Sequence, residues 1–233
     1  MTDVICFWAV IPAAGTGARM QSDLPKQYLP ISGRCVIEYS LETFCTHPQI
    51  AGVVIALASG DKLWKGLSFA GHSKIRTTLG GKERCHSVLN CLYALSSMAG
   101  AEDWVLVHDA ARPCINGEDI DQIIAALRDH PVGGLLALPV RDTMKRADNS
   151  QDGQLVTETV NRQGLWHALT PQMFRLGPLT RALEEAIQKG QMVTDESQAM
   201  EHAGFRPRLV EGRAENIKVT RPSDLKLAEL YLA

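Results

Sequence analysis

Features that would place this chain in one of several broad protein classes are missing from its sequence. No apolar run approaches the roughly 18–20 residues of a membrane-spanning helix, and Asp3 stands where a signal peptide would carry basic residues. The charge is nearly balanced, because 24 basic and 26 acidic residues give a net charge of −2 over 233 residues. We therefore expect a cytosolic protein that binds neither nucleic acid nor a membrane.

Signatures of covalent and metal-based catalysis are missing as well. The six cysteines form no C-x-x-C pair, the seven histidines form no H-x-x-x-H, and there is no G-x-S-x-G nucleophile elbow. We expect reduced, mostly buried thiols and no metal cluster built from protein side chains. Repeats, low-complexity tracts and linkers are also missing. With 45% hydrophobic residues the chain can bury a sizeable core, so we expect one domain over residues 1–233.

Apolar runs alternate with helical patterns through the first two-thirds of the chain. Continuous apolar strands separated by helices are typical of a parallel sheet that is covered on both faces. The predicted fold is therefore α/β and Rossmann-like, with a mostly parallel, twisted sheet. We expect strands at 4–11, 53–58, 74–79, 104–107 and 134–140, and helices at 36–46, 84–98 and 118–128.

Residues 140–162 break this pattern. A polar stretch at 141–148 and an alternating stretch at 154–160 flank a cluster of turn-forming residues at 148–153. We expect a β-hairpin arm that projects from the sheet and packs on a partner chain in a homodimer; a loose surface hairpin is the alternative. After the arm, residues 165–174 should return to the main body. The expected later elements are helices at 178–189 and 195–202, a strand at 207–210 and a helix from about 223.

The most informative segment follows the first predicted strand. It reads Pro12-Ala13-Ala14-Gly15-Thr16-Gly17-Ala18-Arg19-Met20, and Pro25-Lys26-Gln27 follows closely. Small residues let the backbone N–H groups surround an anion, while Arg19 and Lys26 add charge that stabilises a triphosphate under attack. The third glycine of the dinucleotide fingerprint and the Gly-Lys-Ser/Thr ending of the P-loop are both missing. The segment resembles the signature of nucleotidyltransferases that join a nucleoside triphosphate to a sugar phosphate; a plain strand-to-helix turn is the alternative.

Two further loops should meet this segment, because ligands of parallel sheets bind beyond the carboxyl ends of the strands. Residues 80–87 combine two glycines with a helix start, which can bind a base edge or a phosphate. Asp109 can orient a hydroxyl or a metal-bound water, and Arg112 can pair with a phosphate. Each feature has a structural alternative: helix capping at 80–87 and at Thr194, an Asp109–Arg112 pair that fixes its loop, a packed His108, and a surface Lys218 in a β-like run at 217–219.

Taken together, these segments resemble the 2-C-methyl-D-erythritol 4-phosphate cytidylyltransferase family of the non-mevalonate isoprenoid pathway. The resemblance covers essentially the whole chain and is most specific at 108–113, 165–172 and 212–224. It implies a fold of the nucleotide-diphospho-sugar transferase type and transfer of a cytidylyl group from CTP to methylerythritol phosphate. It also implies Mg²⁺ bound mainly through the CTP phosphates, and a homodimer in which the arm closes the neighbour's site. A pentitol-phosphate (ribitol 5-phosphate) cytidylyltransferase is the nearest alternative; a nucleotide-binding regulatory protein and a dinucleotide-dependent oxidoreductase are more distant ones.

The resemblance also implies roles for individual residues. It makes Arg19 and Lys26 stabilisers of the transition state, and Arg162 and Lys218 the residues that position methylerythritol phosphate. It places the CTP contacts at Pro12, Ala13, Ala14, Gly15, Thr16, Gly17, Gly81, Ser87, Asp109 and Ala110. It places polar contacts to the second substrate at Asp109, Arg112, Thr143, Arg162, Thr170, Thr194 and Lys218, with Thr143 and Arg162 serving the other subunit. Two positions depart from the family pattern: Lys82 stands where an acidic residue is common, and Asn161 replaces a frequent Asp or Pro.

Overall fold

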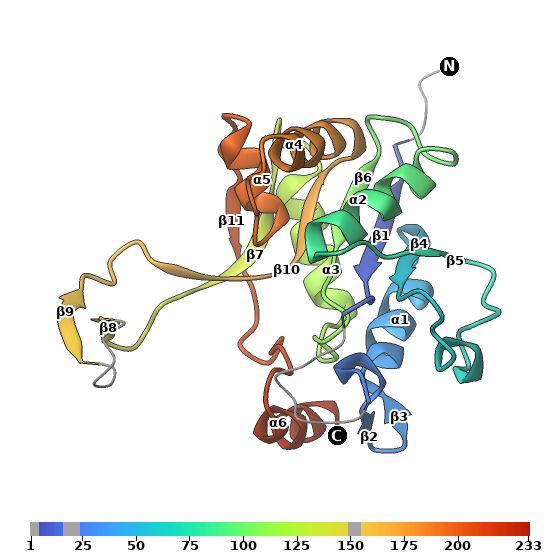
Figure 1. Cartoon of the computed structure of the whole chain (residues 1–233), viewed down its shortest axis with the longest axis horizontal. Coiled ribbons are helices and arrows are strands. Elements are labelled where there is room, and N and C mark those ends of the chain that lie inside the picture. The colour runs from blue at the N-terminus through green and yellow to red at the C-terminus, as the bar shows by residue number, and fades with distance from the viewer. Residues whose placement is uncertain (1–4, 16–23, 149–154) are drawn as a thin grey trace.

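The computed structural model describes residues 5–15, 24–148 and 155–233. Its centre is a seven-stranded sheet with the order β11-β7-β10-β6-β1-β4-β5 (Figure 1). Strand β10 runs antiparallel to β6 and β7, and all other neighbours in the sheet pair in parallel. The predicted mostly parallel α/β sheet is confirmed. Its strands are β1 (Phe7–Pro12), β4 (Ile50–Leu57), β5 (Ile75–Leu79), β6 (Trp104–Val107), β7 (Gly133–Pro139), β10 (Trp166–Arg175) and β11 (Arg208–Glu211).

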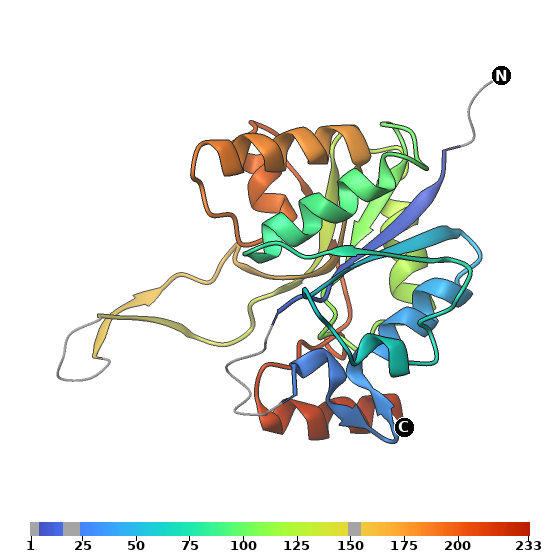
Figure 2. The ribbon, with the colours of Figure 1, turned by 45° about the vertical axis from the view of Figure 1, so that its right-hand side comes forward.

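Helices cover both faces of this sheet, because successive residues of a buried strand point to opposite sides. In β1, Ala9 and Ile11 pack in the hydrophobic cluster that also contains residues of α1 and α3, whereas Val10 packs in the cluster of α2, α4 and α5. Figure 2 shows α2 and α4 together on one face. The helices are α1 (Val36–Thr46), α2 (Arg84–Leu95), α3 (Gly117–Leu127), α4 (Leu176–Gln188) and α5 (Glu196–His202).

Helix α2 ends three residues before the predicted end at Met98. The hydroxyl of Ser96 donates to the carbonyl of Tyr93 at 2.7 Å, and that of Ser97 donates to the carbonyl of Ala94 at 2.9 Å. Such local bonds compete with the helical ladder, so two successive serines favour a turn at this point. At helix α3 a polar side chain instead stabilises the start of the helix: the side chain of Asn116 caps it and accepts the N–H of Asp119 at 2.9 Å.

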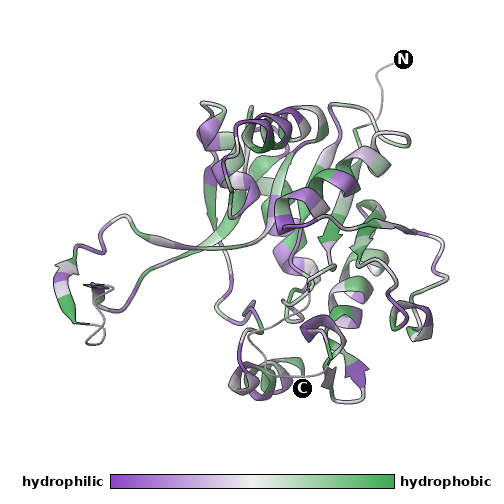
Figure 3. Ribbon diagram, in the orientation of Figure 1, coloured by the Kyte–Doolittle hydropathy of each residue, from purple (hydrophilic) through white to green (hydrophobic). Residues whose placement is uncertain are grey.

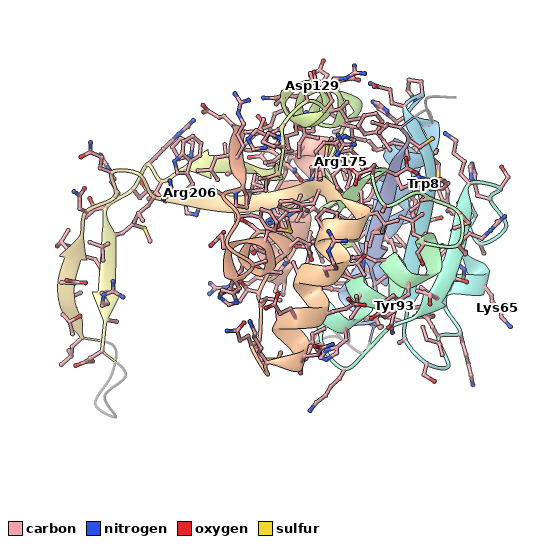
Figure 4. The ribbon with its side chains drawn as sticks, turned by 90° about the horizontal axis from the view of Figure 1, so that it is seen from above. Trp8, Lys65, Tyr93, Asp129, Arg175 and Arg206 are labelled. Carbon is pink, nitrogen blue, oxygen red and sulfur yellow. The ribbon has the colours of Figure 1, made fainter. Side chains whose placement is uncertain are left out.

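The predicted arm is present as a two-stranded antiparallel hairpin of β8 (Met144–Ala147) and β9 (Val156–Val160). It extends from β7 and β10 well beyond the main body, as the view from above makes clear (Figure 4). Leu155 and Val156 are 60% and 63% exposed. The arm mixes polar and apolar residues, whereas the central strands are largely hydrophobic (Figure 3). The hairpin therefore holds apolar side chains that its own chain does not cover.

A small subregion beside the sheet combines a predicted helix, from about 223, with a hairpin that was not predicted from the sequence. Strands β2 (Pro30–Ile31) and β3 (Arg34–Cys35) form a tight hairpin through Ser32 and Gly33, which both have positive φ. Helix α6 (Pro222–Leu232) packs beside it around a third hydrophobic cluster. That cluster contains Leu29, Ile31, Val36, Cys114, Val219 and Ala228. The short helices η2 (Lys26–Tyr28) and η3 (Trp64–Gly66) complete the secondary structure of the described residues.

The structure also tests what the sequence predicted for the segment at 217–219 and for the cysteines. The run at 217–219 is not a strand; it is an extended segment tied by the N–H of Val219 to the carbonyl of Ala111 at 2.8 Å. Among the cysteines, Cys45, Cys85, Cys91 and Cys114 are buried, whereas Cys6 and Cys35 are partly exposed. No helix in the described part of the chain is long and apolar enough to cross a membrane.

Candidate active site

The loops that follow β1, β5 and β6 line a common cleft of about 380 Å³ at the carboxyl ends of these strands. This is the place where ligands of parallel α/β sheets bind. Two segments from elsewhere in the chain, at 26–27 and at Lys218, complete the lining. The lining residues are Pro12, Ala13, Ala14, Gly15, Lys26, Gln27, Gly81, Lys82, Glu83, Arg84, Ser87, Asp109, Ala110, Ala111 and Lys218.

Close packing between the first two loops depends on Gly80. A Cβ atom at this position would lie 2.1 Å from the Cβ of Ala14 and 3.3 Å from the carbonyl oxygen of Leu57. Only glycine lets the turn after β5 approach the loop after β1 so closely. The hydroxyl of Ser87 then accepts the N–H of Gly81 at 3.1 Å and donates to the carbonyl of Glu83 at 3.2 Å. Ser87 therefore holds the shape of the turn that forms one wall of the cleft.

Gln27 holds the loop after β1 from the opposite side. Its side chain is 3% exposed, and its amide nitrogen donates to the carbonyls of Ala13 at 2.7 Å and Gly15 at 3.2 Å. The sequence interpretation singled out its neighbour Lys26 and assigned Gln27 no role. Thr16, Gly17 and Arg19, three of the predicted site residues, lie outside the described residues.

Asp109 is the centre of a charged cluster at the bottom of the cleft. Its Oδ1 accepts from Nε of Arg84 at 2.9 Å and its Oδ2 from Nζ of Lys218 at 2.7 Å, while Nε of Arg112 lies 3.9 Å from Oδ2. The backbone N–H of Asp109 donates to the hydroxyl of Thr170 at 3.1 Å. Burial alone would raise the pKa of this carboxyl, but Arg84 and Lys218 hold the pKa well below its usual range. Asp109 is therefore an anion that orients cations toward the cleft.

Thr170 and His108 form a second layer behind Asp109, and both are buried. Nε2 of His108 lies 3.1 Å from the carbonyl oxygen of Arg112, so this nitrogen carries the proton. Nδ1 then accepts the hydroxyl proton of Thr170 over 3.0 Å. Burial lowers the pKa of His108 to about 4. His108 is thus a neutral packed histidine, as its sequence context suggested, and the hydroxyl of Thr170 is engaged within the protein.

Arg112 also points into the protein in this structure. It is 7% exposed, and its two terminal nitrogens donate to the carbonyls of Asn216 at 2.7 Å and Ala168 at 3.4 Å. Its Nε has no hydrogen-bond partner. The Asp109–Arg112 pair of the alternative interpretation is long, at 3.9 Å, and the two carbonyls are the closer partners of Arg112. These contacts tie the segment before Lys218 to the loop after β6.

Five of the seven predicted contacts to the second substrate do not line the cleft of this chain. Arg112 and Thr170 are held inside the protein, as described above, and the other three are Thr143, Arg162 and Thr194. Thr143 and Arg162 are exposed at the base of the arm, where Arg162 donates to the carbonyl oxygen of Arg141. Thr194 is exposed, and its hydroxyl donates to the side chain of Gln198. The interpretation of Thr194 as the cap of α5 is wrong, because the capping side chain is Asp195, which accepts the N–H of Gln198 at 2.9 Å.

Fold and cleft together define the class of protein. A glycine-bounded cleft that brings cations to the carboxyl ends of a mostly parallel sheet is the arrangement of an α/β nucleotidyltransferase. Residues 7–233 match the model of one family in this class, described as IspD, 2-C-methyl-D-erythritol 4-phosphate cytidylyltransferase. The chain belongs to this family.

Similarity to individual proteins extends over nearly the whole chain. The 2-C-methyl-D-erythritol 4-phosphate cytidylyltransferases of Pseudomonas putida and Pseudomonas aeruginosa are 54% and 53% identical, over 94% and 96% of this chain and 93% and 95% of theirs. A crystal structure of a 4-diphosphocytidyl-2C-methyl-D-erythritol synthase superposes with a TM-score of 0.84 at 36% identity, covering 99% of both chains. The Thermus thermophilus cytidylyltransferase gives 0.79 at 31% identity, over 98% of this chain and 100% of that one. These relatives give no support to the pentitol-phosphate alternative.

Proposed function

We propose that this protein transfers the cytidylyl group of CTP to 2-C-methyl-D-erythritol 4-phosphate, which yields 4-diphosphocytidyl-2-C-methyl-D-erythritol and pyrophosphate. The observation that carries the proposal is the cleft, where Asp109 lies between Arg84 and Lys218 and the two glycine-containing loops meet. Family membership supplies the identity of the substrates.

CTP occupies the part of the cleft formed by the loops after β1 and β5. Backbone groups at 12–15 and at Gly81 face this space, and so does the loop at Asp109 and Ala110. Ser87 supports the turn beneath the nucleotide. Lys26 and Arg19 stabilise the charge that develops on the phosphates during attack.

The phosphate of the second substrate provides the attacking oxygen. At neutral pH this group is already an anion, so no protein base is needed to activate it. Lys218, held by Asp109, positions it beside the α-phosphorus of CTP for in-line displacement of pyrophosphate. Thr170, Arg112 and Thr194 support this side of the site, although none of the three lines the cleft.

Magnesium is part of the proposal. In the described part of the chain, no three acidic, cysteine or histidine side chains are grouped around a metal position, and the acidic residues lining the cleft are Glu83 and Asp109. So few carboxylates fit a cation that is held mainly by the triphosphate, with Asp109 as the nearest protein anion. When bound, Mg²⁺ neutralises phosphate charge and polarises the α-phosphoryl group.

The active protein is proposed to be a cytosolic homodimer. The arm exposes apolar side chains that a second copy can cover, as in a two-fold symmetric dimer. Thr143 and Arg162 stand on this arm and do not line their own chain's cleft. This placement supports a role in the partner's cleft, where Arg162 would position the methylerythritol phosphate.

The test is pyrophosphate release from four nucleoside triphosphates, each combined with methylerythritol phosphate, ribitol 5-phosphate or a third polyol phosphate. We expect turnover with CTP and methylerythritol phosphate and little with any other pair. Preferred use of ribitol 5-phosphate would favour the pentitol alternative, and no release with any pair would contradict cytidylyl transfer.

A further inference from the structure

Arg84 is held in place by a side chain that does not reach the cleft. Glu196, in the first turn of α5, is fully buried. Its two carboxylate oxygens accept from Nη1 and Nη2 of Arg84 at 2.6 and 3.0 Å. The remaining nitrogen, Nε, donates to Asp109 at 2.9 Å. Because a guanidinium is a rigid plane, the two hydrogen bonds that Arg84 donates to Glu196 fix the direction of the third bond, from Nε to Asp109.

We propose that Glu196 is a positioning residue for the cytidylyl transfer, which acts through Arg84 to hold the carboxylate of Asp109 against Lys218. This inference rests on the function proposed above and adds a residue to its machinery. The hydroxyl of Thr170 accepts the backbone N–H of Asp109 and so fixes its main chain. Glu196 fixes the side chain of Asp109 indirectly, through Arg84. Helix α5, which is distant in sequence from the glycine loops, thereby sets the geometry of the cleft.

The Glu196–Arg84 ion pair differs from a purely structural one in where its chain of charges leads. Taking the carboxylate of Glu196 out of water is costly even when it is paired, and apolar packing at the same place would stabilise the fold at a smaller cost. The chain of charges that begins at the buried Glu196 ends at the Asp109–Lys218 pair, and both of these residues line the cleft. What Glu196 contributes is therefore orientation of groups that meet the substrates.

Replacing Glu196 by Gln tests the role with little change of shape. Glu196→Gln offers Arg84 one acceptor oxygen in place of two, so the guanidinium plane can turn away from Asp109. With both substrates we expect kcat to fall about tenfold or more, while KM for CTP stays within about twofold of the wild-type value. Glu201→Gln is the matched control on the same helix, because the carboxylate of Glu201 accepts from the hydroxyl of Ser197 and does not line the cleft within the described residues. It should keep the wild-type kcat, and an unchanged kcat in folded Glu196→Gln overturns the proposal.

A double-mutant cycle separates action through Arg84 from a general structural effect. Arg84→Lys keeps the charge but lacks the plane, so Glu196 has nothing to orient in this background. The Glu196→Gln/Arg84→Lys double variant should have the kcat of Arg84→Lys alone, and losses that multiply would overturn the proposal.

A third variant covers the case in which Glu196→Gln does not fold. The Glu196→Met/Arg84→Met variant removes both members of the ion pair together, so the buried carboxylate of Glu196 is not left without its partner. We expect this variant to fold with kcat at least about tenfold below wild type, and a wild-type kcat would overturn the proposal. A wild-type protein that transfers no cytidylyl group refutes the proposed function along with the inference. An active wild type with an unaffected Glu196→Gln variant refutes the inference alone.

Discussion

The effect of each charged side chain in the cleft on the reaction rate depends on its distance from the atoms on which charge develops during the reaction. Asp109 accepts bonds from two cations at 2.9 and 2.7 Å, so it neutralises and orients them in the absence of substrate. Lys26 lines the same cleft from another segment of the chain. We therefore expect Lys26 to act chiefly on the transition state and Asp109 on the arrangement of the site.

Lys26→Ala should lower kcat by roughly 10²-fold or more, the scale of losing one charge-stabilising group. KM for CTP should change much less, since the charge matters most when one phosphoryl group is attacked. Steady-state kinetics with both substrates measures the two parameters separately. Lys65→Ala, an exposed lysine in η3, is the control and should behave as wild type. A Lys26→Ala variant in which KM alone changes would contradict this role.

His108 makes the stability of the protein depend on pH. Its pKa is about 4 in the folded chain because burial disfavours the charged form, whereas an unfolded histidine titrates near ~6.5. The unfolded chain therefore binds more protons between these values, so stability is lost as pH falls through this window.

His108→Gln should remove this dependence. From pH 7 to pH 5 the wild-type free energy of unfolding should fall by about 2 kcal/mol more than that of His108→Gln. Urea unfolding at both pH values measures the difference, and the comparison cancels the titration of groups common to both proteins. An exposed histidine gives the control: His167→Gln should keep the wild-type slope. Parallel slopes for His108→Gln and wild type would mean that His108 is not held neutral in the fold.

At the residue scale the sequence is least informative where the partner of a side chain is remote in the chain, and the family resemblance, not the residue type, supplied the prediction for Lys218. Lys218 was predicted as a site residue, and it lies in the cleft against Asp109. Whether it performs the proposed role stays a prediction. Glu196 was not among the predicted site residues, since nothing local indicates that it meets Arg84, 112 residues away in the chain. Gln27 was missed for a similar reason, because its partners are backbone carbonyls.

At the scale of elements, the turn between β5 and α2 depends on the lack of a side chain at Gly80. Gly80→Ala would bring a Cβ to within 2.1 Å of the Ala14 side chain, so the two loops must separate. We expect a loss of about 1–3 kcal/mol in unfolding free energy, the usual range for overpacking. Weaker CTP binding by calorimetry should accompany it. Gly71→Ala, where nothing lies within 4 Å of the added carbon, should change neither quantity. A Gly80→Ala protein with wild-type stability and CTP affinity would show that the loops do not need this contact.

Elements themselves were predictable where hydrophobic periodicity is long. The bounds of α1 match the prediction at both ends, and the strands of the sheet other than β10 are found within a few residues of their predicted positions. The β2–β3 hairpin escaped prediction because two-residue strands carry too little periodicity to be recognised. Residues 165–174 were expected only to return to the main body; the structure shows them as strand β10, antiparallel to β7.

At the scale of the whole molecule, the arm extends the chain well beyond its main body (Figure 1). Leu155 and Val156 are mostly exposed on it, and burying them against a second copy is worth about 1.5–3 kcal/mol for each fully covered side chain. Both apolar side chains are then buried only in the dimer. The arm is therefore the basis of both the dimer proposal and the shared-site proposal. The first predicts a dimer in solution, and the second predicts that two inactive variants restore activity when mixed.

Mixing two inactive variants tests the shared site directly. If Arg162 serves the opposite subunit, a dimer of one Lys26→Ala chain and one Arg162→Ala chain holds one site with both defects and one intact site. Random mixing makes about half of the dimers mixed, so about a quarter of wild-type activity per site should return, given free exchange of chains. Native mass spectrometry verifies that mixed dimers form, and either variant mixed with itself is the control. Mixed dimers without activity would assign Arg162 to its own chain's site, and a protein that is monomeric at working concentration would contradict the arm's role in dimerisation.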